Sequence, residues 1–399
     1  MKRFWMTSVA LAALAAAPAW AQTNTITFGS AVQLTGKDAN TGRYYRDAYQ
    51  LAVDKINAKG GIMVAGKPYT FKLTVLDNQS DGNLGVQLYT QLISRDKVDF
   101  LLGSYSSNDV MVDSAVAEKY EMPFVQGGGA SSQIFSRGYK YIFGTLPRAE
   151  DYFSSTIKLM AQLEPKPKTV ALVVADDAFD VAVGIGTREL LKKAGLEIAI
   201  DQQYTQKSAD FSSLLALVKS KAPDAILWGG LAAEVLDEIR QAKSLDVNPK
   251  GFSSYTVGVP TADFRKALDK DAEYAFGMTP WLPTGTLKDD WFGDDAQFNK
   301  EYIAKYGYEP DYHAASAAAD VEVFAKALAK AGTLDKKALR DTIAKIEFDS
   351  LFAHIKFADN GQIDVPQIAI QIQDGKVVPI FTDHLINQPR YPVPSWSKR

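Results

Sequence analysis

The stretch Val98–Phe135 constrains the fold most, because it contains two consecutive strand–turn–helix units. Val98–Leu102 is a short apolar run that ends at Gly103, which is typical of a buried strand. Asp109–Tyr120 has apolar residues at helical spacing. A second strand, Pro123–Val125, leads into a turn of Gly, Ala and Ser and another helix start. This order predicts neighbouring parallel strands in a sheet that is covered by helices.

Both turns of this stretch lie where a strand ends and a helix begins. The first turn carries Ser106 and Ser107, and the second carries Gly128, Ala130 and Ser131. At such a point unpaired N–H groups and the positive end of the helix dipole favour an anion. We expect the two turns to hold the carboxylate of a small molecule. The alternative is that Gly and Ser only form tight turns and cap helices.

The alternation of strand and helix extends over most of the chain. Before the stretch, strands are predicted at Thr25–Val32 and Tyr69–Leu76, with helices at Tyr44–Ala58 and Leu84–Arg95. The pattern begins again after a boundary near Gly144–Pro147. Further strands are predicted at Lys168–Val174, Leu196–Ala199, Ala225–Trp228, Gly251–Val257 and Tyr274–Met278, and further helices at Val181–Ala194, from Ser208 to Lys221 and at Leu231–Ser244. The chain is therefore expected to be α/β, with two doubly wound parallel-sheet lobes.

The last quarter of the chain has a different pattern. Helices are predicted at Ala296–Tyr306, Tyr312–Ala331 and Asp335–Ile346, and strands at Ile355–Phe357, Gln367–Gln373 and Val377–Phe381. Asn360-Gly361 is a hairpin-type turn signal.

The first residues form an export signal. Lys2 and Arg3 precede an apolar run that ends at Ala17 and is too short to span a bilayer. Ala19-Trp20-Ala21 is a small-x-small cleavage site. We expect residues 1–21 to be a signal peptide cleaved after Ala21, and the mature protein to be soluble and periplasmic.

No catalytic constellation is visible in the sequence. The chain has no cysteine, which excludes disulfides and thiolate chemistry, and its net charge of −3 does not suggest nucleic acid. P-loop and Gly-x-Ser-x-Gly motifs are missing. His313, His354 and His384 lie far apart and are expected to be ordinary surface or packing residues. We therefore expect no metal, no cofactor and no enzyme activity, with an exported hydrolase as the least favoured alternative.

Several motifs in order resemble one family. They are Asp-Lys-Ile-Asn-Ala-Lys-Gly-Gly-Ile at Asp54–Ile62, the strand end Leu102–Ser107, the turn that ends at Ser132, and Phe357–Gly361. The chain resembles periplasmic solute-binding proteins of the leucine/isoleucine/valine-binding type, which serve ABC importers. The resemblance implies a type I periplasmic binding architecture, with two lobes joined by three crossings and a ligand between them.

The resemblance also implies where the lobes begin and end. The crossings are expected near Thr145–Pro147, Met278–Pro280 and Phe352–His354. One lobe would comprise residues 22–146 and 281–352. The other would comprise residues 147–280 and 353–399.

In this family a Ser at the first turn and groups at the second turn hold the ligand carboxylate. The matching positions are Ser107, Gly128 and Ala130, with Ser106 beside them. Ala130 replaces the usual hydroxyl residue and offers only its N–H, for which Ser131 is expected to compensate.

An aromatic residue of the second lobe usually covers the ligand, and Phe179 lies at that position. The next aromatic position of the family is Leu231. Tyr105 and Tyr255 are expected to add apolar walls with polar tips.

The expected contact to an amine is missing. The segment that usually carries an acid is residues 253–257, which contains none, and Asp177 is the nearest candidate. A buried ammonium without a counter-charge is costly. The ligand is therefore either a branched-chain-type amino acid or an aromatic or aliphatic acid without an α-amine. The expected partner is a membrane permease, the expected state is a monomer, and a sensor that feeds a chemoreceptor or kinase is the alternative role.

Overall fold

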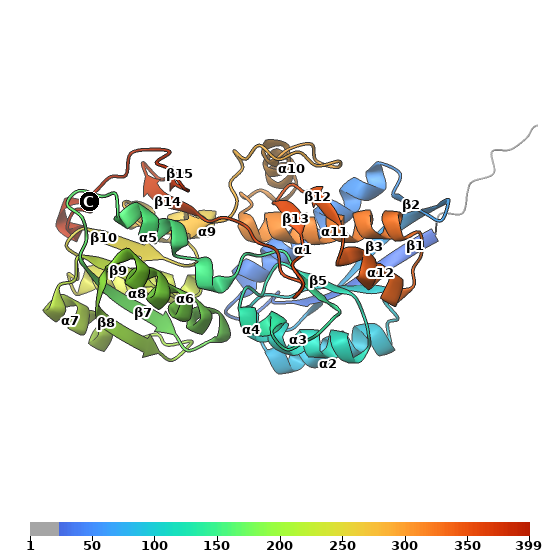
Figure 1. The fold of residues 1–399 in the computed structure, drawn as a ribbon, viewed down its shortest axis with the longest axis horizontal. Coiled ribbons are helices and arrows are strands. Elements are labelled where there is room, and N and C mark those ends of the chain that lie inside the picture. Colours follow the sequence, from blue (N-terminus) through green and yellow to red (C-terminus); the bar gives the residue numbers. More distant parts are fainter. Residues whose placement is uncertain (1–23) are drawn as a thin grey trace, which may run out of the picture.

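The computed structural model describes residues 24–399, so the export signal expected at residues 1–21 lies outside the described residues. The chain forms two α/β lobes that lie side by side along its long axis (Figure 1). Lobe 1 is built on a six-stranded sheet and lobe 2 on a seven-stranded sheet, each covered by helices. The α/β class and the two wound lobes agree with the pattern of the sequence.

Lobe 1 contains the N-terminal strands and a later group of helices. Its strands are β1 (Asn24–Val32), β2 (Ile62–Val64), β3 (Lys67–Asp77), β4 (Phe100–Leu102), β5 (Phe124–Gln126) and β6 (Ile142–Gly144). They lie in the order β2-β3-β1-β4-β5-β6, and every pair except β2–β3 is parallel. Its helices are α1 (Ala39–Ala58), α2 (Gly82–Ser94), α3 (Ser107–Lys119), α4 (Ser132–Phe135), α10 (Asp295–Tyr306), α11 (Tyr312–Ala331) and α12 (Lys336–Ile343).

Lobe 2 contains the middle of the chain and its last strands. Its strands are β7 (Thr169–Ala175), β8 (Glu197–Tyr204), β9 (Ala225–Trp228), β10 (Phe252–Tyr255), β11 (Phe276–Thr279), β14 (Ile368–Gln373) and β15 (Lys376–Phe381). Their order is β15-β14-β11-β10-β9-β7-β8, with β14 and β15 antiparallel to their neighbours. Its helices are α5 (Ser154–Met160), α6 (Ala178–Ala194), α7 (Ser212–Lys221), α8 (Ala232–Ser244) and α9 (Ala262–Leu268), with short 3₁₀ helices η1 (Ala149–Asp151), η2 (Asp269–Ala272) and η3 (Trp396–Lys398).

The helices of the C-terminal region complete the core of lobe 1. α11 packs against α1 and β5, although it lies far from them in the sequence (Figure 1). Phe324 of α11 stacks on Phe100, with ring centroids 5.5 Å apart, and also contacts Phe28. These side chains are buried, so the N-terminal part of lobe 1 needs α11 to complete its hydrophobic core.

Three passages connect the lobes. The first follows β6 and leads through η1 into α5, and the second follows β11 at Thr279. The third lies later than the resemblance implied, which was near Phe352–His354. Gly144 of β6 still exchanges backbone hydrogen bonds with Gly361 and Ile363, so the chain runs along lobe 1 until it enters β14.

Several predicted elements differ from the structure for local reasons. β2 and β6 were not predicted, because three residues are too few to show a period. β8 is longer than the predicted Leu196–Ala199, since it is an edge strand and its second half carries exposed polar side chains. Asn360-Gly361 forms a turn, but it does not join paired strands. The hairpins of the described chain are β2–β3, β14–β15 and a small pair formed by β12 (Glu347–Asp349) and β13 (His354–Lys356).

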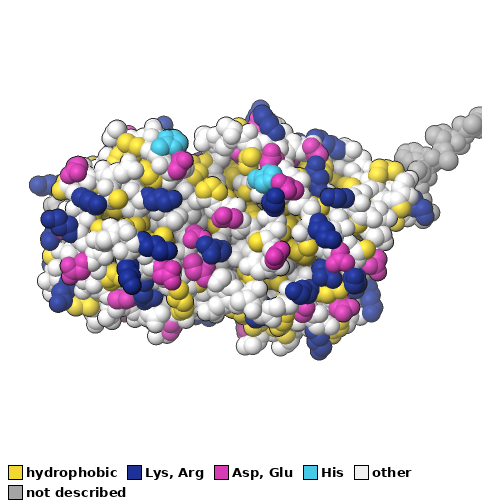
Figure 2. Space-filling model, in the orientation of Figure 1, with side chains coloured by type: hydrophobic (Ala, Val, Ile, Leu, Met, Phe, Trp, Pro, Cys, Tyr) yellow, Lys and Arg dark blue, Asp and Glu magenta, His cyan; other side chains and the backbone are white. Residues whose placement is uncertain are grey.

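The surface carries both signs of charge on both lobes. Basic and acidic side chains are interspersed over the face drawn in Figure 2, without a large patch of one sign. None of the helices in residues 24–399 combines the length and apolar character that crossing a membrane requires.

Candidate functional site

A small pocket lies between the lobes, at the C-terminal ends of β4, β5 and β9. Its lining residues from lobe 1 and the first passage are Tyr105, Ser106, Ser107, Gly128, Ala130, Leu146, Tyr152, Tyr312 and His313, and those from lobe 2 are Phe179, Leu231 and Val257. Ligand sites in α/β sheets lie in such crevices beyond the strand ends. Six of the eight site residues expected from the sequence therefore meet in one pocket.

The N-terminus of α3 faces this pocket with unsatisfied donors. Ser106 is its N-cap residue and makes no side-chain cap bond, and both Ser106 and Ser107 line the pocket. The first N–H groups of a helix have no intrahelical partner, and the helix dipole adds positive potential there. The local sequence supports this geometry, because the buried strand β4 ends at Leu102 and the short turn from Gly103 to Ser106 leads into the helix.

The N–H groups of the second turn are not free for a ligand, although the sequence analysis expected them to be. Gln126 Oε1 accepts the N–H groups of Gly128 and Gly129 at 2.8 and 2.6 Å. Ser107 Oγ accepts the N–H groups of Ala130 and Ser131 at 3.1 and 3.2 Å. The amides of this turn are thus satisfied within the protein, and Ser107 keeps its own hydroxyl proton to donate into the pocket.

Aromatic side chains form most of the pocket wall. Phe179 packs edge-on against Tyr152, with ring centroids 4.8 Å apart. Burial raises the pKa of the hydroxyls of Tyr105, Tyr152 and Tyr312, which therefore remain protonated donors. The hydroxyl of Tyr105 is buried and has no hydrogen-bond partner among the described residues. A polar atom of a bound molecule can satisfy it.

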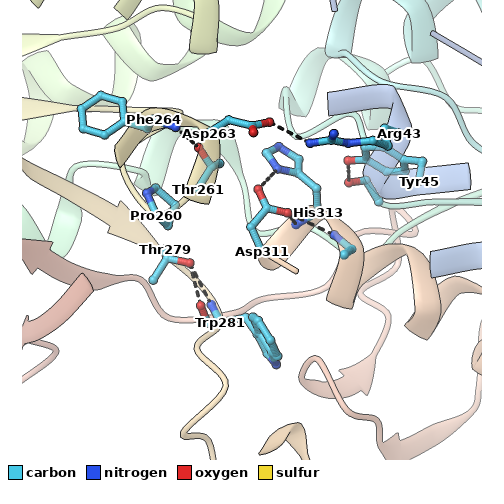
Figure 3. Close-up of polar contacts among 12 residues, drawn as sticks. Arg43, Tyr45, Pro260, Thr261, Asp263, Phe264, Thr279, Trp281, Asp311 and His313 are labelled. Atoms are coloured by element: carbon cyan, nitrogen blue, oxygen red, sulfur yellow. Dashed lines mark hydrogen bonds and ion pairs between the residues drawn. The ribbon is translucent and has the colours of Figure 1, made fainter. Parts of the chain in front are cut away.

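His313 also lines the pocket, which the sequence analysis did not foresee. Its Nδ1 lies 2.8 Å from Asp311 Oδ2, and Asp311 Oδ1 accepts the N–H groups of His313 and Ala314 (Figure 3). The imidazole stacks on Tyr312, with ring centroids 3.9 Å apart, and is only 2 % exposed. The signal in the sequence was Asp-x-His at a helix start, where the Asp is the N-cap. His354 and His384 are exposed, as expected.

The Asp311–His313 pair resembles part of a hydrolytic triad, but the serines do not complete it. In the described chain neither Ser106 nor Ser107 forms a hydrogen bond to the imidazole, and Ser107 Oγ is occupied by two amides. Nucleophile and base must lie within hydrogen-bond reach for activation.

No acidic side chain lies among the lining residues of the pocket. Asp177, the expected candidate for an amine contact, caps α6 instead by accepting the N–H groups of Phe179 and Asp180. Burial, reinforced by the charge of Asp177, raises the pKa of Asp180, which favours its neutral form. Neither residue is among those that line the pocket.

Two expected site residues lie outside the pocket. Tyr255 packs in the apolar core of lobe 2, where burial and the charge of Glu238 raise its pKa. Ser131 is fully buried behind the second turn, and its hydroxyl has no partner within the described residues. The backbone N–H of Ser131 nevertheless supports the site through Ser107.

Polar contacts join the lobes around the pocket. Arg43 of α1 pairs with Asp263 of α9, with Nη2 2.8 Å from Oδ2 (Figure 3). Asn108 of α3 accepts the N–H of Ala178, the first residue of α6, at 3.0 Å and donates to Gln206. These contacts exist only while the lobes are together, so the structure is a closed form.

Among residues 24–399 no group of three or more His, Cys, Asp or Glu side chains could hold a metal ion. The donors of the pocket are backbone amides, hydroxyls and one imidazole. Such groups suit an organic anion with an apolar body.

Comparisons with known proteins agree with this geometry. A sequence model described as "Periplasmic binding protein" matches residues 25–376. A Leu/Ile/Val-binding protein homolog 7 of Brucella melitensis is 26% identical over 393 residues, which is 94% of this chain and 95% of the relative.

Two solved structures share the fold. The branched-chain amino acid transporter substrate binding protein LivJ of Streptococcus pneumoniae, in complex with isoleucine, has a TM-score of 0.77 and 23% identity, and covers 89% of this chain and 98% of its own. A solute binding protein of an ABC transporter from R. palustris, in complex with benzoate, has a TM-score of 0.77 and 17% identity, and covers 91% of this chain and 97% of its own.

Proposed function

Because the chain belongs to the periplasmic binding protein family, we propose that it is the substrate-binding subunit of an ABC importer and captures a small carboxylate in the pocket between its lobes. The observation that carries this proposal is the arrangement of Ser107 at the uncapped start of α3. Ser106 and Ser107, at this helix start, both line a crevice that residues of both lobes form.

The carboxylate binds at the start of α3 and the body of the solute lies among the aromatic rings. Ser106 and Ser107 hold the acid group, Gly128 and Ala130 form the wall beside it, and Tyr105 and Phe179 contact the body. Hydrogen bonds from amides and hydroxyls to a carboxylate are stronger than those to a neutral acceptor. The wall of Leu231 and Val257 accepts an aliphatic or an aromatic group.

Two solute classes fit the proposal. Branched-chain amino acids are supported by the names of the relatives, and acids without an α-amine are supported by the benzoate-bound structure and by the lining residues, which include no acid. The pocket favours the second class, since a buried ammonium needs a counter-charge.

Capture works by closure. An open form exposes the pocket, the solute docks on lobe 1, and lobe 2 closes over it about the three passages. Because the solute touches both lobes only in the closed form, its binding free energy shifts the population toward closure. The permease then recognises the closed surface, and no bond is made or broken.

The protein acts in the periplasm after removal of residues 1–21, and it acts as a monomer. The same pocket can serve a sensor that feeds a chemoreceptor or kinase. An ATPase assay with a candidate permease separates the two roles, because only a transport subunit stimulates ATP hydrolysis by the importer when the solute is present.

The test is a native mass spectrum of the purified protein, followed by isothermal titration with the co-purifying solute, benzoate, isocaproate and leucine. We expect one small carboxylate per chain and a rise in the melting temperature with each solute that binds. Binding of none of these acids, or turnover of a bound ester or amide, would contradict the proposal.

A further inference from the structure

We propose that His313 is the cationic partner of the bound carboxylate, so that the pocket takes up one proton together with an acid that has no α-ammonium group. The inference rests on the proposed function and names the solute class of that site. It assigns a ligand-contacting role to a residue at the start of α11 in lobe 1, which lines the pocket.

The charge balance of the pocket is the first step. The lining residues include no Lys, Arg, Asp or Glu. A carboxylate that leaves water for such a place needs compensating positive charge. The start of α3 supplies the equivalent of about half a charge. His313 is the one lining side chain that can carry a full positive charge near neutral pH.

The geometry of the Asp311–His313 pair is the second step. Asp311 contacts Nδ1 of His313 through Oδ2 and accepts two backbone N–H groups through Oδ1, which holds the ring in place. With Nδ1 held in this way, Nε2 is the ring nitrogen left for the pocket. On a neutral ring Nε2 presents a lone pair, which repels a carboxylate oxygen. On a protonated ring it donates a charge-assisted hydrogen bond.

The other groups around the imidazole do not supply that charge. Tyr312 of α11, Tyr45 of α1, Tyr105 after β4 and Tyr152 after η1 are the titratable neighbours, and burial raises the pKa of each hydroxyl, so all four stay neutral. The ion pair of Arg43 and Asp263, drawn in the same view in Figure 3, is internally neutral. Asp311 is the acidic side chain in direct contact with the ring, through its Oδ2 and Nδ1.

An α-ammonium group would oppose this arrangement. A second cation in the same small pocket repels a protonated His313, and no lining carboxylate offsets it. Leucine and isocaproate differ only by this amine, so they form a matched pair of probes. The structure therefore favours isocaproate or benzoate over leucine.

The test is isothermal titration of the full-length mature protein at pH 7 in phosphate and in Tris, whose different ionisation enthalpies report protons taken up on binding. With benzoate or isocaproate we expect uptake of up to about one proton per solute. The affinity should fall with rising pH wherever binding takes up a proton, by up to about tenfold per pH unit. His313→Gln should abolish the uptake and weaken binding about tenfold or more. Asp311→Asn, which keeps the helix cap, should reduce the uptake.

His384→Gln is the matched control, because this exposed histidine also pairs with an aspartate but lies outside the pocket. It should take up protons like the unaltered protein. Binding of benzoate or isocaproate without proton uptake, uptake that survives in His313→Gln, or tighter binding of leucine would overturn the inference while leaving solute capture intact. Binding of none of the three probes would overturn the proposed function as well. The proton count of the unaltered protein decides the matter even if a variant does not fold.

Discussion

Arg43 of lobe 1 and Asp263 of lobe 2 pair across the cleft, with Nη2 2.8 Å from Oδ2. The guanidinium also lies over the ring of Tyr308, 4.0 Å from its centroid, so lobe 1 holds it in place independently of Asp263. An ion pair that forms between two moving parts contributes to their closed arrangement rather than to the fold of either part. Both side chains are about one-third exposed, which limits the contribution.

We predict that Asp263→Asn weakens solute binding about two- to fivefold, because loss of a partly exposed ion pair removes at most about 1 kcal/mol from the closed form. The effect should shrink at high salt. Isothermal titration at two salt concentrations measures it. Arg188→Ala is the control, since its ion pair with Asp201 is equally exposed but lies within lobe 2. An equal loss of affinity in that control would contradict a role for Arg43–Asp263 in closure.

Ser107→Ala should have a larger effect. It removes a hydroxyl donor from the pocket and leaves the N–H groups of Ala130 and Ser131 without their acceptor. We expect affinity to fall about tenfold or more and stability to fall by about 1–2 kcal/mol, measured by titration and denaturant unfolding. Ser136→Ala, at an exposed position near the second turn, should change neither quantity. Unchanged affinity in Ser107→Ala would remove the hydroxyl from the site.

Much of this site could be predicted from the sequence, because its first turn follows from local chemistry. A buried strand, a glycine and a serine-rich helix start define the place of Ser106 and Ser107 without tertiary information. Phe179 was found through the resemblance, and the α/β alternation gave both sheets. These features are encoded within short segments.

His313 could not be assigned in this way, since it reaches the pocket only through the packing of α11 on α1 and β5. The hydrogen-bond partners of the second turn also depend on tertiary contacts. The side-chain amide oxygen of Gln126 and the hydroxyl of Ser107 accept N–H groups that look open in the sequence. Tyr255, the last residue of β10, was expected to add a wall to the pocket, but its side chain belongs to the apolar core of lobe 2. A strand alternates its side chains between two faces, and the sequence does not tell which face meets the cleft.

Gly128→Ala should disrupt the wall of the pocket. A Cβ at Gly128 would lie 1.8 Å from the backbone oxygen of Ser104, which cannot move without shifting the first turn. We expect a loss of roughly 1–3 kcal/mol of stability together with a clear loss of affinity. Gly138→Ala has open space around its Cβ and suffers only from its positive φ, so it should cost about 1 kcal/mol and leave affinity unchanged. Unchanged solute affinity in a well-folded Gly128→Ala variant would contradict the close packing of residue 128 against the backbone of Ser104.

Glu238 should make stability depend on pH. Burial raises its pKa to about 8, against the opposing effects of hydrogen bonding to Tyr255 and the charge of Arg399. The unfolded chain releases this proton near the ordinary value for Glu, so between about pH 4.5 and 8 the folded state binds one more proton than the unfolded state. Stability should therefore fall as pH rises through this window.

Glu238→Gln removes that proton exchange. We expect the free energy of unfolding of the unaltered protein to fall relative to the variant, by up to about 1.4 kcal/mol per pH unit within the window. Urea unfolding at about pH 5.5, 6.5 and 7.5 gives the comparison, because all three values lie within the window. Parallel pH profiles of the two proteins would show that Glu238 is ionised in the folded state.

The hydrogen bond from the N–H of Ala178, at the start of α6, to Asn108 of lobe 1 exists only in the closed form, so this amide reports separation of the lobes. Whenever the lobes part, the amide hydrogen of Ala178 passes from the side chain of another lobe to bulk water. Its isotope exchange with deuterated solvent should be slow when solute is bound and fast when it is not, while amides in the middle of β7 exchange slowly in both cases. The exchange rate of this one backbone amide therefore measures how often the two lobes separate.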